Sequence, residues 1–374
     1  MPPRHQSGYG EIMKTGKVPE NILKRSVLGQ IRTKRKDVAG GAGPGEDCAI
    51  FLPPGAGSGG IAVCMQETAV ALEDERYDFG GAGLRLTMGH LIQKCANNLA
   101  ASAARPSALL ITLLLPENTE EKKLKALMAE AENKCRELSL EIAGGQTRVC
   151  AAVSAPIAVA SGYGVCLESA CCRDKGFAGR AEPGQDIVVS KWIGLEGTAL
   201  LAGYNREGLL SRYPAWLVDE ASGFGRYLSV LPEAEAALEA GVCAMHDASE
   251  GGIFGALWEL AEGGGVGLSV DMRSLPLRQE TVEVCEFCNV DPYRLMSGGC
   301  LVMTAKDGPG LAAVLRERQI PAAVVGRVTE GSDRILWKDG EVRYLDRAGR
   351  DEIHRYLSNI ICRKETGKQK GDEK

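Results

Sequence analysis

The first segment that could support chemistry is glycine-rich, Gly43-Pro44-Gly45-Glu46-Asp47, just ahead of a strand-like run at 48–52. Glycines allow a backbone to approach phosphate oxygens closely, and an adjacent carboxylate can hold the Mg²⁺ that neutralises their charge. No Gly-Lys-Ser/Thr follows, so the segment is not a Walker A loop. Two interpretations stay open for the segment alone, a phosphate-binding loop or an ordinary turn.

Two glycine pairs further along could also present backbone amides to a ligand. Gly144 and Gly145 end a strand-like run, where they would form either a ligand-facing loop or a plain turn. Gly251 and Gly252 precede the helical run IFGALWELAE. Unpaired amides at a helix N-terminus bind anions, so this second pair is a candidate anion site.

Asp247 precedes the second glycine pair and has two possible roles. It could meet a ligand beside the glycine amides, or it could form a capping box with Glu250 for a helix predicted over 247–262. The neighbouring His246 is one of four histidines in the chain and could be structural or catalytic. A further turn, Gly194-Leu195-Glu196-Gly197-Thr198, leads from a predicted strand into a predicted helix in the same way.

The chain contains 13 cysteines, most of them single residues in apolar stretches. Such residues are typical of a core in a reducing compartment. Cys285 and Cys288 form a CxxC pair, but a zinc site needs about four ligands and no second pair follows. We therefore favour core thiols over a metal site at this pair.

The composition is that of a folded protein of two or three domains, with 374 residues, 44% of them apolar and 25% charged. The net charge of −5 gives no reason to expect nucleic acid or an anionic membrane as a partner. Apolar runs are shorter than the roughly 20 residues that a bilayer requires, and the N-terminus lacks an apolar signal core. We expect a cytoplasmic protein.

Hydrophobic periodicity predicts strands and amphipathic helices in both halves of the chain. One helix has an apolar stripe of Leu84, Met88, Leu91, Cys95 and Leu99. The predicted helices cover 19–31, 83–100, a segment capped by Asn118, 247–262 and 309–318, and the predicted strands include 61–65, 108–116, 139–145 and 151–167. Asp339-Gly340 is the signal of a type I′ hairpin. The fold class that we predict is α+β.

In this order, the motifs resemble the aminoimidazole-ribonucleotide-synthetase superfamily. The resemblance extends over about 40–330 and rests on GPGEDCAIF, CANNLAASAARP, IAGGQT, VSKWIGLEGTALLA, HDASEGGIFGALWE and CEFCNVDPYRLMSGGCLV. The segments GLEGTALLA and DPYRLMSGG look most like the hydrogenase-maturation branch. The resemblance implies two α+β domains, a homodimer whose N-terminal-domain strands form a shared β-barrel, and ATP under the glycine-rich loop.

The implied domain limits are 1–39 for a lead-in with a helix, 40–172 for the ATP-binding domain, 173–350 for the second domain and 351–374 for a helix and tail. The implied reaction uses ATP and Mg²⁺ to phosphorylate a carbonyl or amide oxygen of a small-molecule substrate. A phosphate makes that oxygen a better leaving group, and Mg²⁺ offsets the developing charge.

By the same resemblance, Asp47, Glu46 and Glu67 would hold Mg²⁺, and Asp47 and Asp247 would be the catalytic residues. The residues that would bind the nucleotide or another anionic part of the ligand are Gly43, Gly45, Glu46, Asn98, Gly144, Gly145, Gly251 and Gly252. The family has carboxylates where this chain has Asn98 and Gln146, and these amides remove negative charge from the site.

Two alternative functions follow from these departures. The first is a non-catalytic ligand-binding or regulatory homologue that retains the cleft with a degenerate metal site. The second is a carbamoyl dehydratase of the hydrogenase-maturation type, whose C-terminal Pro-Arg-Ile-Cys carries the substrate on its thiol. This chain has Ile360-Ile361-Cys362 near its end, without the Pro and Arg and with twelve residues following.

Overall fold

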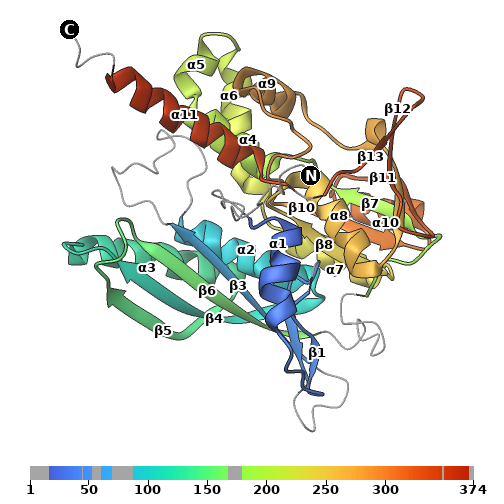
Figure 1. Cartoon of the computed structure of the whole chain (residues 1–374), viewed down its shortest axis with the longest axis horizontal. Coiled ribbons are helices and arrows are strands. Elements are labelled where there is room, and N and C mark those ends of the chain that lie inside the picture. The colour runs from blue at the N-terminus through green and yellow to red at the C-terminus, as the bar shows by residue number, and fades with distance from the viewer. Residues whose placement is uncertain are drawn as a thin grey trace, which may run out of the picture.

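The computed structural model describes 17–43, 45–52, 60–69, 87–166, 179–347 and 349–369, with backbone alone for 39, 40, 67, 69 and 361–369. Figure 1 shows two β-sheets with helices packed around them, one sheet in each half of the described chain. This arrangement confirms the α+β prediction. None of the helices in the described ranges combines the length and apolarity needed to span a bilayer.

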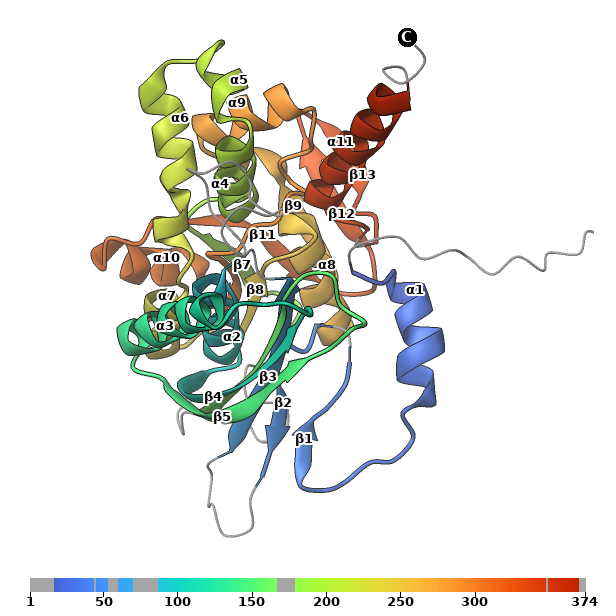
Figure 2. The same cartoon turned by 90° about the vertical axis from the view of Figure 1, so that its left-hand side faces the viewer.

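The N-terminal sheet has the strand order β1-β2-β3-β6-β4-β5. All its pairings are antiparallel except β4 with β5. Helices α2 and α3 cover one of its faces (Figure 2). The bounds are β1 Val38–Gly40, β2 Ala49–Phe51, β3 Ile61–Ala69, α2 Met88–Ala101, β4 Ala104–Leu115, α3 Glu121–Leu138, β5 Glu141–Val149 and β6 Ile157–Cys166.

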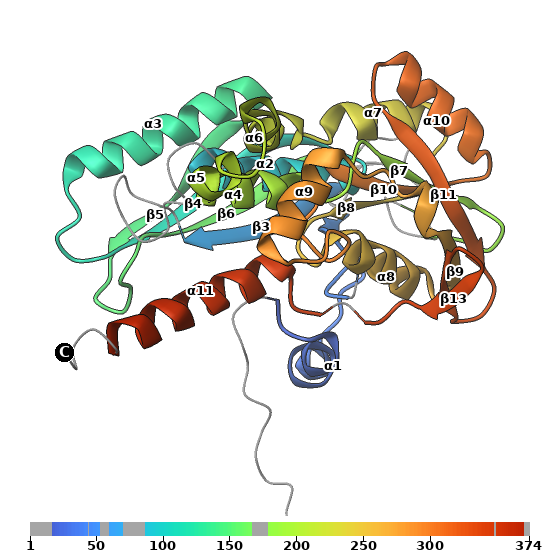
Figure 3. The same ribbon diagram turned by 90° about the horizontal axis from the view of Figure 1, so that it is seen from above.

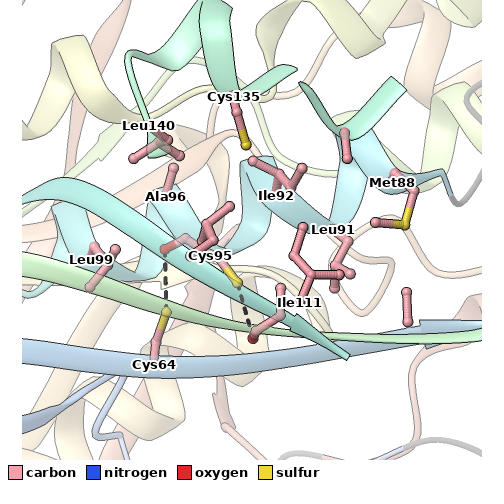
Figure 4. Packing of buried hydrophobic residues seen from close by; sticks show 14 of the residues in the cluster. Cys64, Met88, Leu91, Ile92, Cys95, Ala96, Leu99, Ile111, Cys135 and Leu140 are labelled. Atoms are coloured by element: carbon pink, nitrogen blue, oxygen red, sulfur yellow. Dashed lines mark hydrogen bonds between the residues drawn. The ribbon is translucent and has the colours of Figure 1, made fainter. Parts of the chain in front are cut away.

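Helix α2 buries the predicted apolar stripe against this sheet. Met88, Leu91, Cys95 and Leu99 are all fully buried, whereas Leu84 lies outside the described residues. Figure 4 shows two thiols that donate to backbone carbonyls in this core, Cys64 to Cys95 and Cys95 to Ala160. The cysteines of this region are therefore core residues, as their single placement in the sequence predicted.

The opposite face of the N-terminal sheet has no helix over it among the described residues. Large apolar side chains are exposed there, namely Ile61, Met65, Leu110 and Val165. They alternate along their strands with the buried residues Ala62, Cys64, Leu109 and Ile111.

The C-terminal sheet has the order β13-β12-β9-β11-β7-β10-β8, with β8 at one edge. Helix α8 packs on one face of this sheet, and α7, α10 and the end of α2 pack on the other. The strands are β7 Asp186–Ser190, β8 Ala244–Ala248, β9 Gly267–Asp271, β10 Cys300–Ala305, β11 Ala322–Thr329, β12 Arg334–Lys338 and β13 Glu341–Tyr344. Because α2 contributes to the cores of both halves, it lies between the two sheets.

The remaining helices belong to the same half of the chain, and several of them pack on one another in a core cluster of their own. They are α4 Leu195–Tyr204, α5 Arg206–Leu210, α6 Ala215–Ser222, α7 Leu231–Glu239, α8 Gly252–Gly264, α9 Gln279–Cys288, α10 Gly308–Glu317 and α11 Glu352–Gln369. The N-terminal helical segment begins with α1 Glu20–Ile22 and continues to Gln30, which confirms the helix predicted there. Figure 3 shows α1 beside α8, and α11 running outward toward the C-terminus.

Two local predictions are wrong. Asn118 does not cap α3, because it adopts a left-handed conformation in the preceding turn and the N-cap is Glu120. Asp247 is not helical, because it lies in β8 and α8 begins only at Gly252. The capping box is therefore absent. The hairpin at Asp339-Gly340 is confirmed, with positive φ at both residues.

Candidate functional site

Two motifs 199 residues apart in the sequence meet at His246. Its Nδ1 lies 3.0 Å from Asp47 Oδ2, and its Nε2 lies 3.1 Å from Glu259 Oε2 on α8. The imidazole is 5% exposed, so two carboxylates flank it away from solvent. The structure thus joins the glycine-rich loop to the second half of the chain through one side chain.

The two carboxylates make His246 a buried cation. Burial alone disfavours the imidazolium, but the charges and hydrogen bonds of Asp47 and Glu259 raise the pKa of His246 to about 10. Burial would likewise raise the pKa of Glu259, yet the hydrogen bond from His246 and the charge of Lys17 hold it well below its usual value. Near neutral pH, the pKa of His246 therefore keeps its imidazole protonated between the two acidic side chains.

The loop that carries Asp47 is held directly against α8. Gly45 has φ +73°, and a β-carbon built on it would lie 2.4 Å from the carbonyl oxygen of Glu259. Glycine is therefore required at this position by backbone conformation and by close approach. Glu46 ion-pairs with Arg180 at 3.7 Å, and burial raises the pKa of Glu46. At Gly45, the loop is therefore packed directly against α8.

Asp247 points to the opposite side of β8 from His246, because successive strand residues face opposite ways. It is 4% exposed, and its Oδ1 has no hydrogen-bond partner among the described residues. Burial, followed by the negative charges of Asp47 and Glu196, raises the pKa of Asp247 to about 7.

A polar stripe of α2 lies opposite Asp247. His90, Gln93, Lys94 and Asn97 recur at helical spacing and, with Asp247, help to line a small cavity between the two halves of the chain. The predicted helix over 83–100 was assigned only its apolar stripe, and this second, polar stripe was missed. The sequence pattern that could have revealed the polar stripe is the spacing i, i+3, i+4, i+7 of polar residues on a helix whose other face is apolar.

An ion pair spans the boundary beside this cavity. His90 Nε2 lies 2.7 Å from Glu196 Oε1, and both side chains are buried. The amide of Gly298 donates to the other oxygen of Glu196 at 3.1 Å. Burial opposes ionisation, but Lys94 and His90 bring the pKa of Glu196 well below its usual range. The Gly194–Thr198 turn thus contributes a carboxylate, and its first amide donates to Ser297 Oγ at 2.8 Å.

The amides proposed as an anion site at the start of α8 already have partners within the chain. The amide of Gly251 donates to Asp351 Oδ2 at 2.6 Å, and that of Gly252 donates to the carbonyl of Ser249. Asp351 is fully buried. A carboxylate from just before α11 therefore occupies the position that an anionic ligand was expected to take.

Gly144 and Gly145 lie in β5, which is separated from β2 by the strands β3, β6 and β4. With about 4.8 Å between strands, this corresponds to roughly 19 Å along the sheet. The two glycines therefore do not join Asp47 within one chain. The register does align Glu67 of β3 with Gln146 of β5 in one row across the sheet.

The other predicted site residues are placed as follows. Asn98 lies near the end of α2, where its carbonyl accepts from the Cys48 thiol. The side chain of Glu67 is outside the described residues, as is that of Cys362, although both backbones are described. Gly43 is the last residue of the described range 17–43 and is half-buried.

Within the described ranges, no group of three or more His, Cys, Asp or Glu side chains is arranged to hold a metal ion. Cys285 and Cys288 are both buried in α9. Burial raises the pKa of both thiols, which disfavours the thiolates that zinc binds. These observations agree with core thiols at this pair.

Comparisons with known proteins agree with this two-part architecture. The family model described as AIR synthase related protein, N-terminal domain, matches residues 45–166, and that of the C-terminal domain matches residues 182–338. Together the two models match more than half of the chain. The chain belongs to the AIR synthase related family. The resemblance that the motifs predicted is therefore confirmed.

Several of the similar proteins are carbamoyl dehydratases HypE. The chain is 30% identical over 259 residues to carbamoyl dehydratase HypE of Rhodobacter capsulatus, covering 67% of this chain and 73% of that protein. It is 26% identical over 340 residues to carbamoyl dehydratase HypE of Azotobacter vinelandii, covering 89% of each.

Solved structures show the same fold of the AIR synthase related family. A crystal structure of HypE in complex with ATP matches with a TM-score of 0.63 and 21% identity, covering 89% of this chain and 96% of that one. A HypE–HypF complex matches with a TM-score of 0.67 and 20% identity, covering 87% of this chain and 99% of that one.

Proposed function

We propose that this protein is an ATP-dependent enzyme that activates a carbonyl or amide oxygen of a small substrate, in the manner of a carbamoyl dehydratase. The proposal rests on one observation: the Gly45–Asp47 loop contacts β8 and α8. In this contact Asp47 lies beside His246, and the charge of Asp47 acts on Asp247. The HypE relatives, one of them solved with ATP, support the nucleotide and the reaction class.

The residues of this chain have distinct roles in the proposal. His246 holds Asp47 in place, and α8 supports the loop through Gly45. The charge of Asp47 acts on Asp247, so we place the reacting oxygen near these two carboxyl groups, at the edge strand β8. ATP supplies the phosphoryl group that makes an amide oxygen a better leaving group.

Mg²⁺ is part of this proposal through Asp47 and Glu67, but the described residues fit a metal only in part. One oxygen of Asp47 is engaged by His246, and Asn98 and Gln146 are neutral where the family has carboxylates. Mg²⁺ is commonly held by one or two carboxylates together with substrate phosphates. We therefore expect the nucleotide to contribute most of the ligands of the ion.

We also propose a homodimer formed through the uncovered face of the N-terminal sheet, as part of a shared β-barrel. The exposed Ile61, Met65, Leu110 and Val165 supply the apolar surface. Gly144, Gly145 and Gln146 lie on the exposed strand β5 of the same sheet, so a dimer would bring them near a second chain. The domain limits 40–172 and 173–350 remain part of the proposal.

The test is phosphate release from ATP by the full chain with Mg²⁺ and acetamide as a minimal amide substrate. Asp47→Ala should lower the rate about 100-fold or more if Asp47 positions the transferred group. Asp37→Ala is the matched control, because Asp37 directly precedes the neighbouring strand β1 and its half-exposed side chain pairs with Arg35 instead of His246. The control should keep wild-type activity.

The competing function is a non-catalytic binding protein, which the neutral Asn98 and Gln146 favour. It predicts that ATP raises the melting temperature of the wild type without any turnover that depends on Asp47. At 100 times the Kd, bound ATP should stabilise the fold by about 2.7 kcal/mol. That pair of results would replace the enzyme by a binding protein.

A further inference from the structure

The C-terminal sheet has an open edge at β13, Glu341–Tyr344. Figure 1 shows β12 and β13 far from the strands of the N-terminal sheet. Among the described strands, β13 has a neighbour on one side alone, which is β12, and all four residues of β13 are exposed. The main-chain groups along such an edge can pair with a strand of another chain.

The main chain of β13 alternates between its partner strand and the open edge. Directly after the strand, the amide of Leu345 donates to the carbonyl of Arg334, the first residue of β12, at 2.8 Å. Hydrogen bonding in an antiparallel pair alternates along the strand, so the main-chain groups of Arg343 and Glu341 also face β12. The N–H and C=O of Val342 therefore point to the open edge.

The side chains of β13 divide into an apolar face and a charged face. Val342 and Tyr344 are 47% and 65% exposed on one face, and Trp337, which lies opposite Val342 on β12, is 43% exposed beside them. Glu341 and Arg343 lie on the other face, where they pair at 3.3 Å. An exposed apolar patch beside charged residues is typical of a protein interaction surface.

The charges of β13 match those of a second copy of the same strand in one antiparallel register. Two-fold symmetry and the alternation of hydrogen bonds require that one residue lies opposite its own copy at the centre of the pairing. A centre at Glu341 or Arg343 places like charges opposite each other, and a centre at Tyr344 places Arg343 opposite the apolar Leu345. A centre at Val342 places Glu341 of each chain opposite Arg343 of the other. In that register, the Val342 N–H of each chain donates to the Val342 carbonyl of the other.

We propose that β13 is a self-association site, at which two copies of this chain join edge to edge in the register centred on Val342. The pairing joins the seven-stranded sheets of the two chains and brings Val342 and Trp337 of both copies into one apolar stripe. Four residues form a small interface, so we expect a weak association that depends on concentration. This contact is separate from the one proposed for the N-terminal sheet. With both two-fold contacts, the chain would form tetramers or longer assemblies.

The test is analytical ultracentrifugation of the full chain over a range of concentrations. Every sample carries Met65→Glu, which puts a charge on the exposed apolar face of the N-terminal sheet and so removes the other proposed contact. Association should remain in this background. Val342→Pro should weaken it about tenfold or more, because proline has no N–H to donate across the interface. The Val342 N–H faces away from β12, so the hairpin itself tolerates proline there.

Two charge reversals supply a second test that does not depend on proline. Glu341→Arg and Arg343→Glu should each weaken association about tenfold when studied alone, because like charges then lie opposite each other across the interface. A mixture of the two variants should associate again, since every acidic side chain then faces a basic one. Lys125→Glu, at an exposed position of α3, is the matched control and should leave association unchanged.

Three results would overturn the proposal. The first is a Met65→Glu background that stays monomeric at every concentration. The second is unchanged association in Val342→Pro and in both single charge variants. The third is a mixture of the two charge variants that associates no better than either variant alone. Association restored by mixing would support the register centred on Val342 and would show that both variants are folded.

Discussion

Gly45 is the position at which the contact between the glycine-rich loop and α8 can be tested most directly. In Gly45→Ala, the new methyl group would lie 2.4 Å from the carbonyl oxygen of Glu259, whereas real β-carbons stay at least 3.0 Å away, so loop or helix must move by about 0.6 Å. Overpacking of this kind costs about 1–3 kcal/mol. The left-handed backbone at φ +73° adds about 1–2 kcal/mol for any residue other than glycine.

Gly241→Ala is the matched control, because Gly241 has φ +75° but open space around its α-carbon. Urea unfolding followed by circular dichroism should show that Gly45→Ala loses about 1–3 kcal/mol more stability than Gly241→Ala. ATP turnover should fall only in Gly45→Ala, since Asp47 follows two residues later. Equal losses of stability in the two variants would refute the close packing of this loop on α8.

Three further predictions concern charge and burial. The pKa of His246 is raised from 6.5 to about 10, so the contribution of its charge to stability is complete below about pH 6.5 and is lost as the pH rises to 10. The melting temperature of the wild type should therefore fall between pH 6.5 and 10, and that of His246→Gln should change less over the same range. Asp351→Ala should lower the free energy of unfolding in urea by about 1–3 kcal/mol, because the buried amide of Gly251 loses its acceptor. Asp346 is exposed, so Asp346→Ala should lower it by less than about 0.5 kcal/mol, the usual limit for a surface change. Burial of Cys288 raises its thiol pKa to about 12, so a chelator such as EDTA should leave the melting temperature unchanged; a fall would indicate a bound metal.

Local pattern was sufficient for much of the fold. The apolar stripe of α2, the position of strand β4 and the Asp339-Gly340 hairpin were predicted correctly, because periodicity and turn chemistry act over a few residues. The prediction that β4 is a buried strand was wrong for one of its faces, on which Leu110 is exposed. The motif order was sufficient for the family. The helix predicted over 247–262 was wrong at its start, because a strand buried on both faces has no alternation that separates it from a helix.

The candidate site depends on contacts between distant segments. The sequence by itself determined that Asp47, His246 and Asp247 are present in ordered motifs, that glycine stands at position 45, and that α2 carries both an apolar and a polar stripe. Only the tertiary structure decided that His246 bridges Asp47 and Glu259, that Asp351 caps the Gly251 amide, and that the polar stripe faces Asp247. The reason is physical: the charge and unmet hydrogen bonds of a side chain depend on what surrounds it. Asp47 lies 199 residues from His246 in the sequence and Asp351 lies 100 residues from Gly251, so local pattern does not show these neighbours.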